Sequence, residues 1–407
     1  MTHSSHAGSA LAEDPSTQDR STHGGLILAV ESSCDETAAA VVERGSRTLS
    51  SVVASQIPIH SPYGGVVPEL ASREHLRNVV PVVRAALEKA GCRFSDLDAI
   101  AVTSGPGLAG ALLVGISYAK ALAYATGKPL VAVNHIEGHI HAVLLEQRQL
   151  SATQEPMPLP ALALVVSGGH THLYLTRQQG SSRDGGWTYH NVGRTVDDAA
   201  GEAFDKVAKL LGLGYPGGPW IDGLAPHGNS SAVPFSFSQV KAKAHRPGQR
   251  AALPRFLFSF SGIKTAVLHY VQVHGMQPSI DVRHRALAAI EHPKLSDVLA
   301  LCDAPTLDLI ASFQRAVVGD LKRKTFRAAE ELGAHSILVS GGVAANRELR
   351  TRFTAEAAKR GLPIAFPSLA LSTDNAAMIA AAAWPKLLAG DLAPANLSAD
   401  PSLALGR

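Results

Sequence analysis

Apolar residues along the chain fall into three stretches of one design, in which a β-branched run ends in a turn of small or polar residues. Residues 26–42 and 162–175 each predict a strand, a tight turn and a returning strand. Residues 337–347 predict a strand whose two glycines lead into a helix. Glycine at such turns lets backbone N–H groups approach an anion without a Cβ in the way. The repeated pattern therefore indicates two similar halves with turns suited to phosphate.

Strand and helix patterns alternate between these stretches. Strands are predicted at 98–103 and 129–134. Helices are predicted at 79–90, 104–126, 199–211, 307–332, 347–360 and 375–388. One Gly-Gly turn alone would be an ordinary tight turn. Two hairpin-first halves with a later Gly-Gly loop instead resemble an α/β class, the duplicated ribonuclease-H-like two-lobe fold of actin, sugar kinases and Hsp70-type ATPases.

This resemblance implies a division of the chain into lobes. Its 407 residues are about twice the usual length of one domain, which fits two packed lobes. Residues 223–255 have little periodicity and indicate an irregular insertion. We expect five parts: a disordered tail at 1–24, a first lobe at 25–150, a second lobe at 151–372 that contains the insertion, a C-terminal helix at 373–390 packing back between the lobes, and a tail at 391–407.

Composition excludes several classes of protein. Hydrophobic residues make up 46% of the chain and charged residues 17%, which is typical of a globular protein and not of a disordered or membrane-embedded one. No apolar run approaches the roughly 20 residues of a spanning helix, so no membrane association is expected. Cys34, Cys92 and Cys302 form no CxxC pair, as in proteins of a reducing compartment, and a cytoplasmic location is expected.

The net charge of +3 does not by itself identify a nucleic-acid-binding protein, because phosphate contacts need a local patch. Two basic clusters are candidate contacts, although each can also be an ordinary solvated surface. The first contains Lys241, Lys243, His245, Arg246 and Arg250. The second lies on a predicted helix and contains Lys322, Arg323, Lys324 and Arg327.

Candidate metal ligands lie in residues 133–142. His135 and His139 are four apart, so on a helix they share one face and can bind one ion. Asn134 suits an N-cap, which puts both rings near the positive end of the helix dipole, where we expect them to stay neutral. A divalent ion needs a further, charged ligand, and Asp374 before the last Ala-rich helix is the candidate. Spacing alone leaves open that these are capping and surface residues.

Glu137 between the two histidines raises the alternative of a zinc peptidase. In the HExxH motif the glutamate directly follows the first histidine, whereas Glu137 is two residues after His135, roughly 200° around the helix axis. We therefore expect Glu137 to point away from an ion. A hydrolytic base would have to come from elsewhere.

Three further carboxylates are candidates for binding substrate. Asp198, Glu202 and Asp205 are spaced i, i+4, i+7, which predicts one face of a helix, either as a binding surface or as a solvated acidic stripe. Residues 215–219 form a Pro/Gly turn that permits close approach of a ligand. Asn346 begins a helix after a Gly-Gly pair and suits a contact with adenine or ribose.

Nine strings occur in order between about residues 26 and 382: VESSCDET, GGVVPELASREH, TSGPGLAGALLVG, NHIEGHIHA, VSGGHT, DDAAGEAFDKVAKLLGLGYPGGP, FSFSGIKT, SGGVAAN and STDNAAM. Together they resemble the universal tRNA N6-adenosine threonylcarbamoyltransferase family in its bacterial form. That family was once described as an O-sialoglycoprotein endopeptidase, and this older activity is the first alternative. A nucleotide-binding chaperone or kinase-like ATPase is the second, since it fits the fold but leaves the HxxxH motif unexplained.

The resemblance implies transfer of the threonylcarbamoyl group from threonylcarbamoyl-AMP, the co-substrate, to the N6 amine of the adenosine 3′ of the anticodon. The tRNAs are those that read codons beginning with A. The implied partners are tRNA, a non-catalytic paralogue and a small ATPase. One divalent metal per subunit is implied, with Fe(II) favoured and Zn(II) the competitor.

Site residues follow from the same resemblance, position by position. The metal ligands correspond to His135, His139 and Asp374. The substrate loop corresponds to Val165, Val166, Ser167, Gly168 and Gly169. The remaining substrate positions are Asp205, Gly218, Asp222 and Asn346, and no catalytic acid or base is assigned.

Overall fold

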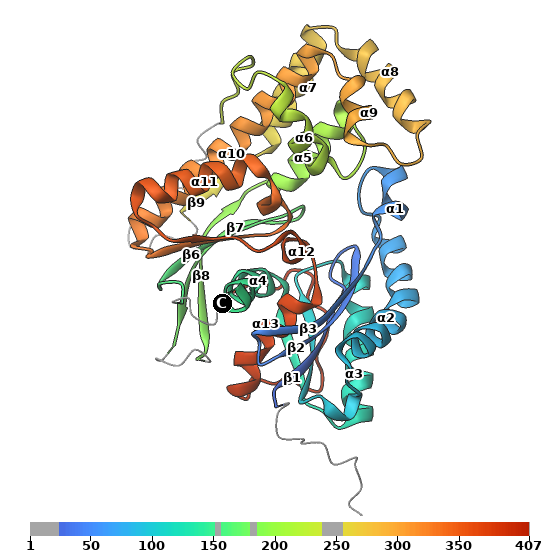
Figure 1. Cartoon of the computed structure of the whole chain (residues 1–407), viewed down its shortest axis with the longest axis vertical. Helices are drawn as coiled ribbons and strands as arrows, with labels where there is room; N and C mark the ends of the chain where they lie inside the picture. The colour runs from blue at the N-terminus through green and yellow to red at the C-terminus, as the bar shows by residue number, and fades with distance from the viewer. Residues whose placement is uncertain (1–23, 151–155, 180–184, 238–254, 407) are drawn as a thin grey trace, which may run out of the picture.

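A computed structural model of the chain describes residues 24–150, 156–179, 185–237 and 255–406. The predicted N-terminal tail, apart from Gly24, and the basic cluster that begins at Lys241 lie outside the described residues. The described residues form two lobes, each built on one mixed sheet, with helices between and around the sheets (Figure 1).

The first lobe contains a five-stranded sheet of order β3-β2-β1-β4-β5. Its strands are β1 (Leu26–Glu31), β2 (Glu36–Glu43), β3 (Arg47–Ser55), β4 (Ala99–Gly105) and β5 (Leu130–Asn134). β1 is fully buried because both of its faces are covered: Leu28 packs toward α2 (Pro68–Ala90) and α3 (Ala109–Thr126), and Ile27 toward α13 (Ala376–Leu388). A strand buried on both faces reads as a continuous apolar run, as this one does.

The second lobe repeats this topology. Its sheet has the order β11-β10-β6-β7-β8-β9, and β8-β7-β6-β10-β11 corresponds strand for strand to β3-β2-β1-β4-β5. The bounds are β6 (Ala161–Val166), β7 (Thr171–Gln178), β8 (Trp187–Thr195), β9 (Phe256–Phe258), β10 (Ser336–Ser340) and β11 (Ile364–Ala365). In both lobes the first three strands are antiparallel and the later ones run parallel to the first. The predicted duplicated ribonuclease-H-like fold is confirmed.

Helix α4 (His135–Leu150) lies between the two sheets. Its Ala142 and Leu145 pack with α13 on the first sheet, while Ile140 and Val143 pack on β6 and β10 of the second. The same helix therefore belongs to the cores on both sides of the lobe interface (Figure 1). The exact lobe boundaries proposed from the sequence stay predictions.

The outer face of the second sheet is covered by α5 (Ala200–Leu210), α6 (Gly217–Leu224), α10 (Ala304–Leu332) and α11 (Arg347–Arg360). Three helices that the apolar pattern did not predict gather at the end of this lobe distant from α13: α7 (Ser261–Val273), α8 (Gln277–Ala288) and α9 (Leu295–Ala300) (Figure 1). The remaining short helices are α1 (Ile57–His60) and α12 (Leu369–Ser372).

Two expectations about helices need correction. Helix α2 begins at Pro68 and not at residue 79, because its first turns are polar and bury only Ala71 and His75. Helix α3 is long and apolar enough to cross a membrane by length and composition, contrary to the expectation of no such run. Its Leu112 and Ile116 instead pack into the first-lobe core. Core helices of soluble proteins pass the same test of length and composition.

Candidate active site

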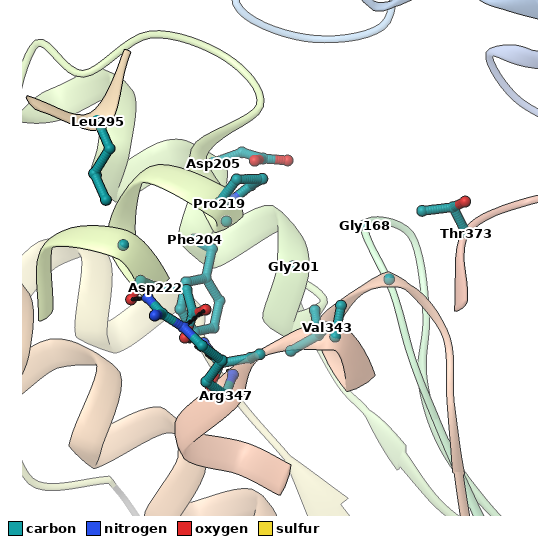
Figure 2. Close-up of a pocket in the computed structure, with 15 residues that line it drawn as sticks. Gly168, Gly201, Phe204, Asp205, Pro219, Asp222, Leu295, Val343, Arg347 and Thr373 are labelled. Carbon is teal, nitrogen blue, oxygen red and sulfur yellow. Dashed lines mark hydrogen bonds and ion pairs between the residues drawn. The ribbon is translucent and has the colours of Figure 1, made fainter. Parts of the chain in front are cut away.

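A cavity of about 490 Å³ in the second lobe is lined mainly by glycines and apolar side chains (Figure 2). Gly168, Gly218 and Gly342 line it, and no heavy atom lies within 4 Å of the position a Cβ would take on any of them. Phe204 and Leu295 supply apolar walls. Exposed backbone amides beside apolar surface suit a ligand with a phosphate and a flat ring. We call this space the small cavity.

Two predicted substrate residues lie at the polar edge of the small cavity and are held in place by the fold. Asn346 caps α11: its Oδ1 accepts from the Leu349 amide at 2.9 Å, and its Nδ2 donates to Gln314 Oε1 at 2.7 Å. Asp222 accepts from the backbone amide of Arg347 at 3.1 Å and from its Nε at 2.9 Å. Each side chain keeps an acceptor lone pair for a ligand.

The glycine turn after β6 contains only part of the predicted substrate loop. Ser167 and Gly169 line a second cavity, and Gly168 lines both. Val165 and Val166 do not line either cavity, because they are the fully buried last residues of β6 and pair with β7. Their side chains therefore belong to the sheet.

The second cavity, the large cavity, has about 1010 Å³ and is formed by both lobes. It shares Gly168, Asp205, Gly342 and Thr373 with the small cavity, so the two cavities adjoin. From the first lobe it is lined by three short segments: 33–36, 64–66 and 106–108. His135 and Asp374 are also in its wall.

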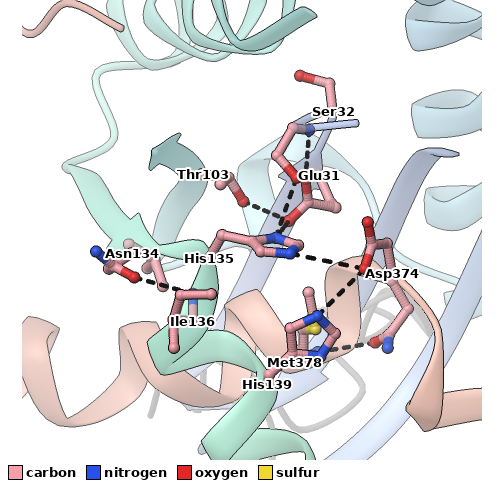
Figure 3. A network of polar contacts seen from close by, with 12 residues as sticks. Glu31, Ser32, Thr103, Asn134, His135, Ile136, His139, Asp374 and Met378 are labelled. Carbon is pink, nitrogen blue, oxygen red and sulfur yellow. Dashed lines mark hydrogen bonds and ion pairs between the residues drawn. The ribbon is translucent and has the colours of Figure 1, made fainter. Parts of the chain in front are cut away.

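His135, His139 and Asp374 come together at this wall, from the first turn of α4 and the segment between α12 and α13 (Figure 3). Their ligand atoms lie within 4.8 Å of one another. Asp374 Oδ1 is 3.6 Å from Nε2 of His135 and 3.2 Å from Nε2 of His139. Both ring nitrogens of His139 are buried, and the Asp374 carboxylate contacts this ring. Two nitrogens and one carboxylate oxygen around one point fit a divalent cation.

Glu31, at the end of β1, contacts Nδ1 of His135, whereas Asp374 lies near Nε2 of the same ring (Figure 3). Oε2 of Glu31 lies 3.1 Å from Nδ1 of His135 and accepts from Thr103 Oγ1 at 2.7 Å, and its Oε1 accepts from the Ser33 amide at 2.5 Å. A carboxylate at Nδ1 keeps the proton there and leaves the Nε2 lone pair for a metal. This residue was not predicted, although a glutamate that ends an entirely apolar strand was a visible signal.

The two histidines differ in protonation. Burial lowers the pKa of His135, but the carboxylates of Asp374 and Glu31 outweigh it and raise the pKa to about 9. Burial lowers the pKa of His139 below its usual value, and the neighbouring His135 adds to this effect. In the absence of a cation, the expectation of a neutral ring therefore agrees with the lowered pKa of His139, whereas two nearby carboxylates favour the protonated ring of His135. A bound cation would take the place of the His135 proton.

Glu137 points away from these ligands, as expected. It is buried and accepts from the Tyr189 hydroxyl of β8 at 3.1 Å. Asn134 also behaves as predicted, since its Oδ1 accepts from the Ile136 amide at 2.9 Å. The arrangement therefore lacks the glutamate that an HExxH peptidase uses as its base.

The three carboxylates predicted on one helix face are separated by the structure. Helix α5 starts at Ala200, so Asp198 precedes it, and Asp198 and Glu202 pair with Lys206 at 2.7 and 2.9 Å. Asp205 alone lines both cavities, with Oδ1 accepting from the Gly217 amide at 2.7 Å. Burial raises its pKa to about 6.

The basic cluster on α10 is neutralised by acidic partners. Lys322 pairs with Glu356, Lys324 with Asp320 and Arg327 with Glu331, at 3.0, 2.7 and 2.6 Å, and Arg323 also pairs with Asp320. Paired cations contribute less to phosphate binding than free ones do. This cluster is therefore a weaker candidate for a nucleic-acid-binding surface than its sequence indicated.

Comparisons with known proteins identify the family of the chain. A family model described as tRNA N6-adenosine threonylcarbamoyltransferase matches residues 47–381. The tRNA N6-adenosine threonylcarbamoyltransferase of Koribacter versatilis is 61% identical over 382 residues, covering 93% of this chain and 99% of that protein. The enzyme of the same name from Moorella thermoacetica is 48% identical over 379 residues, covering 93% and 97%.

Among solved structures, full-length HypF in its phosphate- and nucleotide-bound form has a TM-score of 0.50 and 12% identity, over 89% of this chain and 46% of that chain. A likeness at this identity supports the two-lobe fold alone. The family match is of a different kind, because it extends over most of the chain and includes both histidines, Asp374, the lining of the small cavity and most of the lining of the large one. The chain therefore belongs to the tRNA N6-adenosine threonylcarbamoyltransferase family.

Proposed function

We propose that the chain transfers the threonylcarbamoyl group of threonylcarbamoyl-AMP to the N6 amine of the adenosine 3′ of the anticodon, in tRNAs that read codons beginning with A. One observation carries the proposal: a cluster of metal-type ligands lies at the wall of a large cavity that adjoins a small, glycine-lined one. A transfer between two large substrates needs two connected spaces that meet at the reacting atoms.

In this proposal the adenylate occupies the small cavity. Backbone amides of Gly168, Gly169 and Gly342 are available to its phosphate, and the apolar walls to its adenine. Asp222 and Asn346 would accept from ribose hydroxyls or the adenine amine. The carbamoyl end then reaches the boundary between the two cavities, where Asp205 and Thr373 lie.

His135, His139 and Asp374 would hold one divalent cation, with Fe(II) favoured and Zn(II) the competitor. When bound, such an ion supplies Lewis-acid polarisation of substrate oxygens. Glu31 keeps His135 oriented toward this point. Positioning matters because the adenine N6 amine is a weak nucleophile, its lone pair being delocalised into the ring.

The target base lies in an anticodon loop, where it is already single-stranded, so its extrusion into the large cavity costs little. The partners in this proposal are tRNA, a non-catalytic paralogue and a small ATPase. A cytoplasmic location follows from the same set of partners.

The test is a reconstituted reaction with threonine, bicarbonate, ATP, partner proteins and unmodified tRNA, followed by mass analysis of the nucleosides. His139→Ala should lose both bound metal and transfer, whereas His190→Ala, at an exposed position of β8, should keep both. Full transfer by His139→Ala with its metal content unchanged would remove the metal site from the proposal. Cleavage of a glycoprotein, or autonomous ATP turnover, would support the older peptidase or the ATPase alternative.

A further inference from the structure

Three lysines line the large cavity: Lys206 and Lys209 on α5, and Lys264 on α7. Lys264 belongs to the string FSFSGIKT, which the metal site and the small cavity leave without a role. Lys209 is exposed and Lys264 is half-buried, so both side chains of the cavity lining are open to solvent at least in part. We call these two residues the lysine rim.

The two lysines of the rim have no acidic partner in the described part of the chain, so their charges are available to a ligand. The third lysine, Lys206, is not available in this way, because it pairs with Asp198 and Glu202 at 2.7 and 2.9 Å. Lys209 donates to the backbone carbonyl of Tyr63 at 3.1 Å, an uncharged partner from the other lobe. Lys264 has no hydrogen-bond or ion-pair partner among the residues that the structure describes.

Acidic side chains line the inner wall of the large cavity, although burial raises the pKa of Glu36 to about 8, so this group is largely protonated at neutral pH. Asp35, Glu36 and Asp205 line this wall, close to the ligand Asp374. An ionised carboxylate repels phosphate, so a nucleic-acid backbone binds less favourably at this wall than at the lysine rim. We therefore expect a nucleotide that enters the large cavity to keep its phosphates at the rim and to insert its base.

We propose that Lys209 and Lys264 bind the phosphates on either side of the target adenosine and thereby set the direction from which the tRNA loop enters. The inference rests on the proposed function, since it assigns the small cavity to the adenylate and the large one to the acceptor base. The loop approaches between α5, α7 and the Gly64 turn, and the inserted base meets the carbamoyl group at the boundary of the two cavities.

The size of the effect follows from counterion release. Each phosphate contact with a single strand contributes about 0.7 to the slope of log affinity against log salt concentration. Loss of both contacts should therefore lower that slope by about 1.4. The KM for tRNA should rise, while the KM for threonylcarbamoyl-AMP and kcat at saturating tRNA should stay near their wild-type values.

The experiment measures tRNA binding by the full chain with its partner proteins at several salt concentrations, for Lys209→Gln, Lys264→Gln and the double variant. Arg327→Gln is the matched control, since it removes one cation that is paired with Glu331 on α10. A lower slope in the rim variants and an unchanged slope in the control support the proposal. Thermal unfolding of each variant checks that the fold is kept.

The lysine rim would be contradicted by an unchanged slope in the double variant or by an equal decrease in the Arg327→Gln control. Loss of binding to the paralogue in place of tRNA would also overturn it, because the lysines would then form a protein interface. The proposed function fails separately, if the wild-type complex binds tRNA but forms no modified nucleoside.

Discussion

Glu31 and His135 lie 104 residues apart in the sequence, yet Oε2 of the first is 3.1 Å from Nδ1 of the second, and both side chains are buried. The contact joins the end of β1 to the first turn of α4. It makes Glu31 a positioning residue for a candidate metal ligand without making it a candidate ligand itself.

Glu31→Gln should therefore weaken metal binding by about 10-fold to 100-fold, the usual effect of losing such a partner. The amide cannot accept the Nδ1 proton as strongly as the carboxylate does, so the ring loses its fixed orientation. Competition with a chelator measures the affinity. Glu88→Gln, at an exposed position of α2, is the control, and equal affinities in the two variants would contradict the positioning role.

Gly168→Ala should raise the KM for threonylcarbamoyl-AMP and leave the fold intact. The added Cβ meets no protein atom within 4 Å and projects into space that both cavities share, at a cost to binding of about 1–3 kcal/mol. Gly262→Ala is a matched control, since its Cβ is equally free but lies in the first turn of α7, away from the small cavity. Steady-state kinetics measure the KM for threonylcarbamoyl-AMP in both variants. An unchanged KM in Gly168→Ala would mean that the adenylate binds elsewhere.

Asp205 should make stability depend on pH. Burial raises its pKa in the folded protein to about 6, above the unfolded value of about 4, so the folded state holds the proton more tightly between these two pH values. Its contribution is therefore fully present below about pH 4 and is lost as pH rises toward about pH 6, by roughly 1–3 kcal/mol. Asp205→Asn should abolish this decrease, because the amide does not ionise.

Urea unfolding of the wild type and of Asp205→Asn at pH 4, 5, 6 and 7 measures the free energy of unfolding of each. The value for the variant should rise relative to that of the wild type as the pH increases. The variant keeps an oxygen that can accept from the Gly217 amide. A difference in stability that is constant across this range would show that the pKa of Asp205 is not raised.

The C-terminal segment should stabilise both lobes. Asn134 Nδ2 donates to the Leu403 carbonyl at 3.2 Å, Pro401 lines the large cavity, and Leu405 is buried against residues of α4 and the second lobe. Leu405→Ala should lower the free energy of unfolding by about 2 kcal/mol, whereas Leu392→Ala, which is 46% exposed, should change it by less than about 1 kcal/mol. Equal effects in thermal unfolding would mean that the end of the chain is not docked.

Much of this protein could be predicted from its local patterns. The hairpins of β1–β2 and β6–β7 follow from apolar runs with a polar turn between them, and the shared direction of His135 and His139 follows from 3.6 residues per turn. Glu137 points away for the same reason. Such features depend only on backbone geometry over a few residues, which the order of residue types specifies.

Other features were decided by the packing of distant segments. Asp374 reaches His139 only because α13 docks beside α4 on the first sheet. Asp198 pairs with Lys206 and is not part of α5, because this helix begins at Ala200, two residues later than the spacing of the three carboxylates suggested. The pKa of His135 depends on Glu31 from another strand. The sequence by itself determined the elements and the type of ligands, whereas tertiary structure decided which charges meet, because contact energies between remote residues leave no periodic signal along the chain.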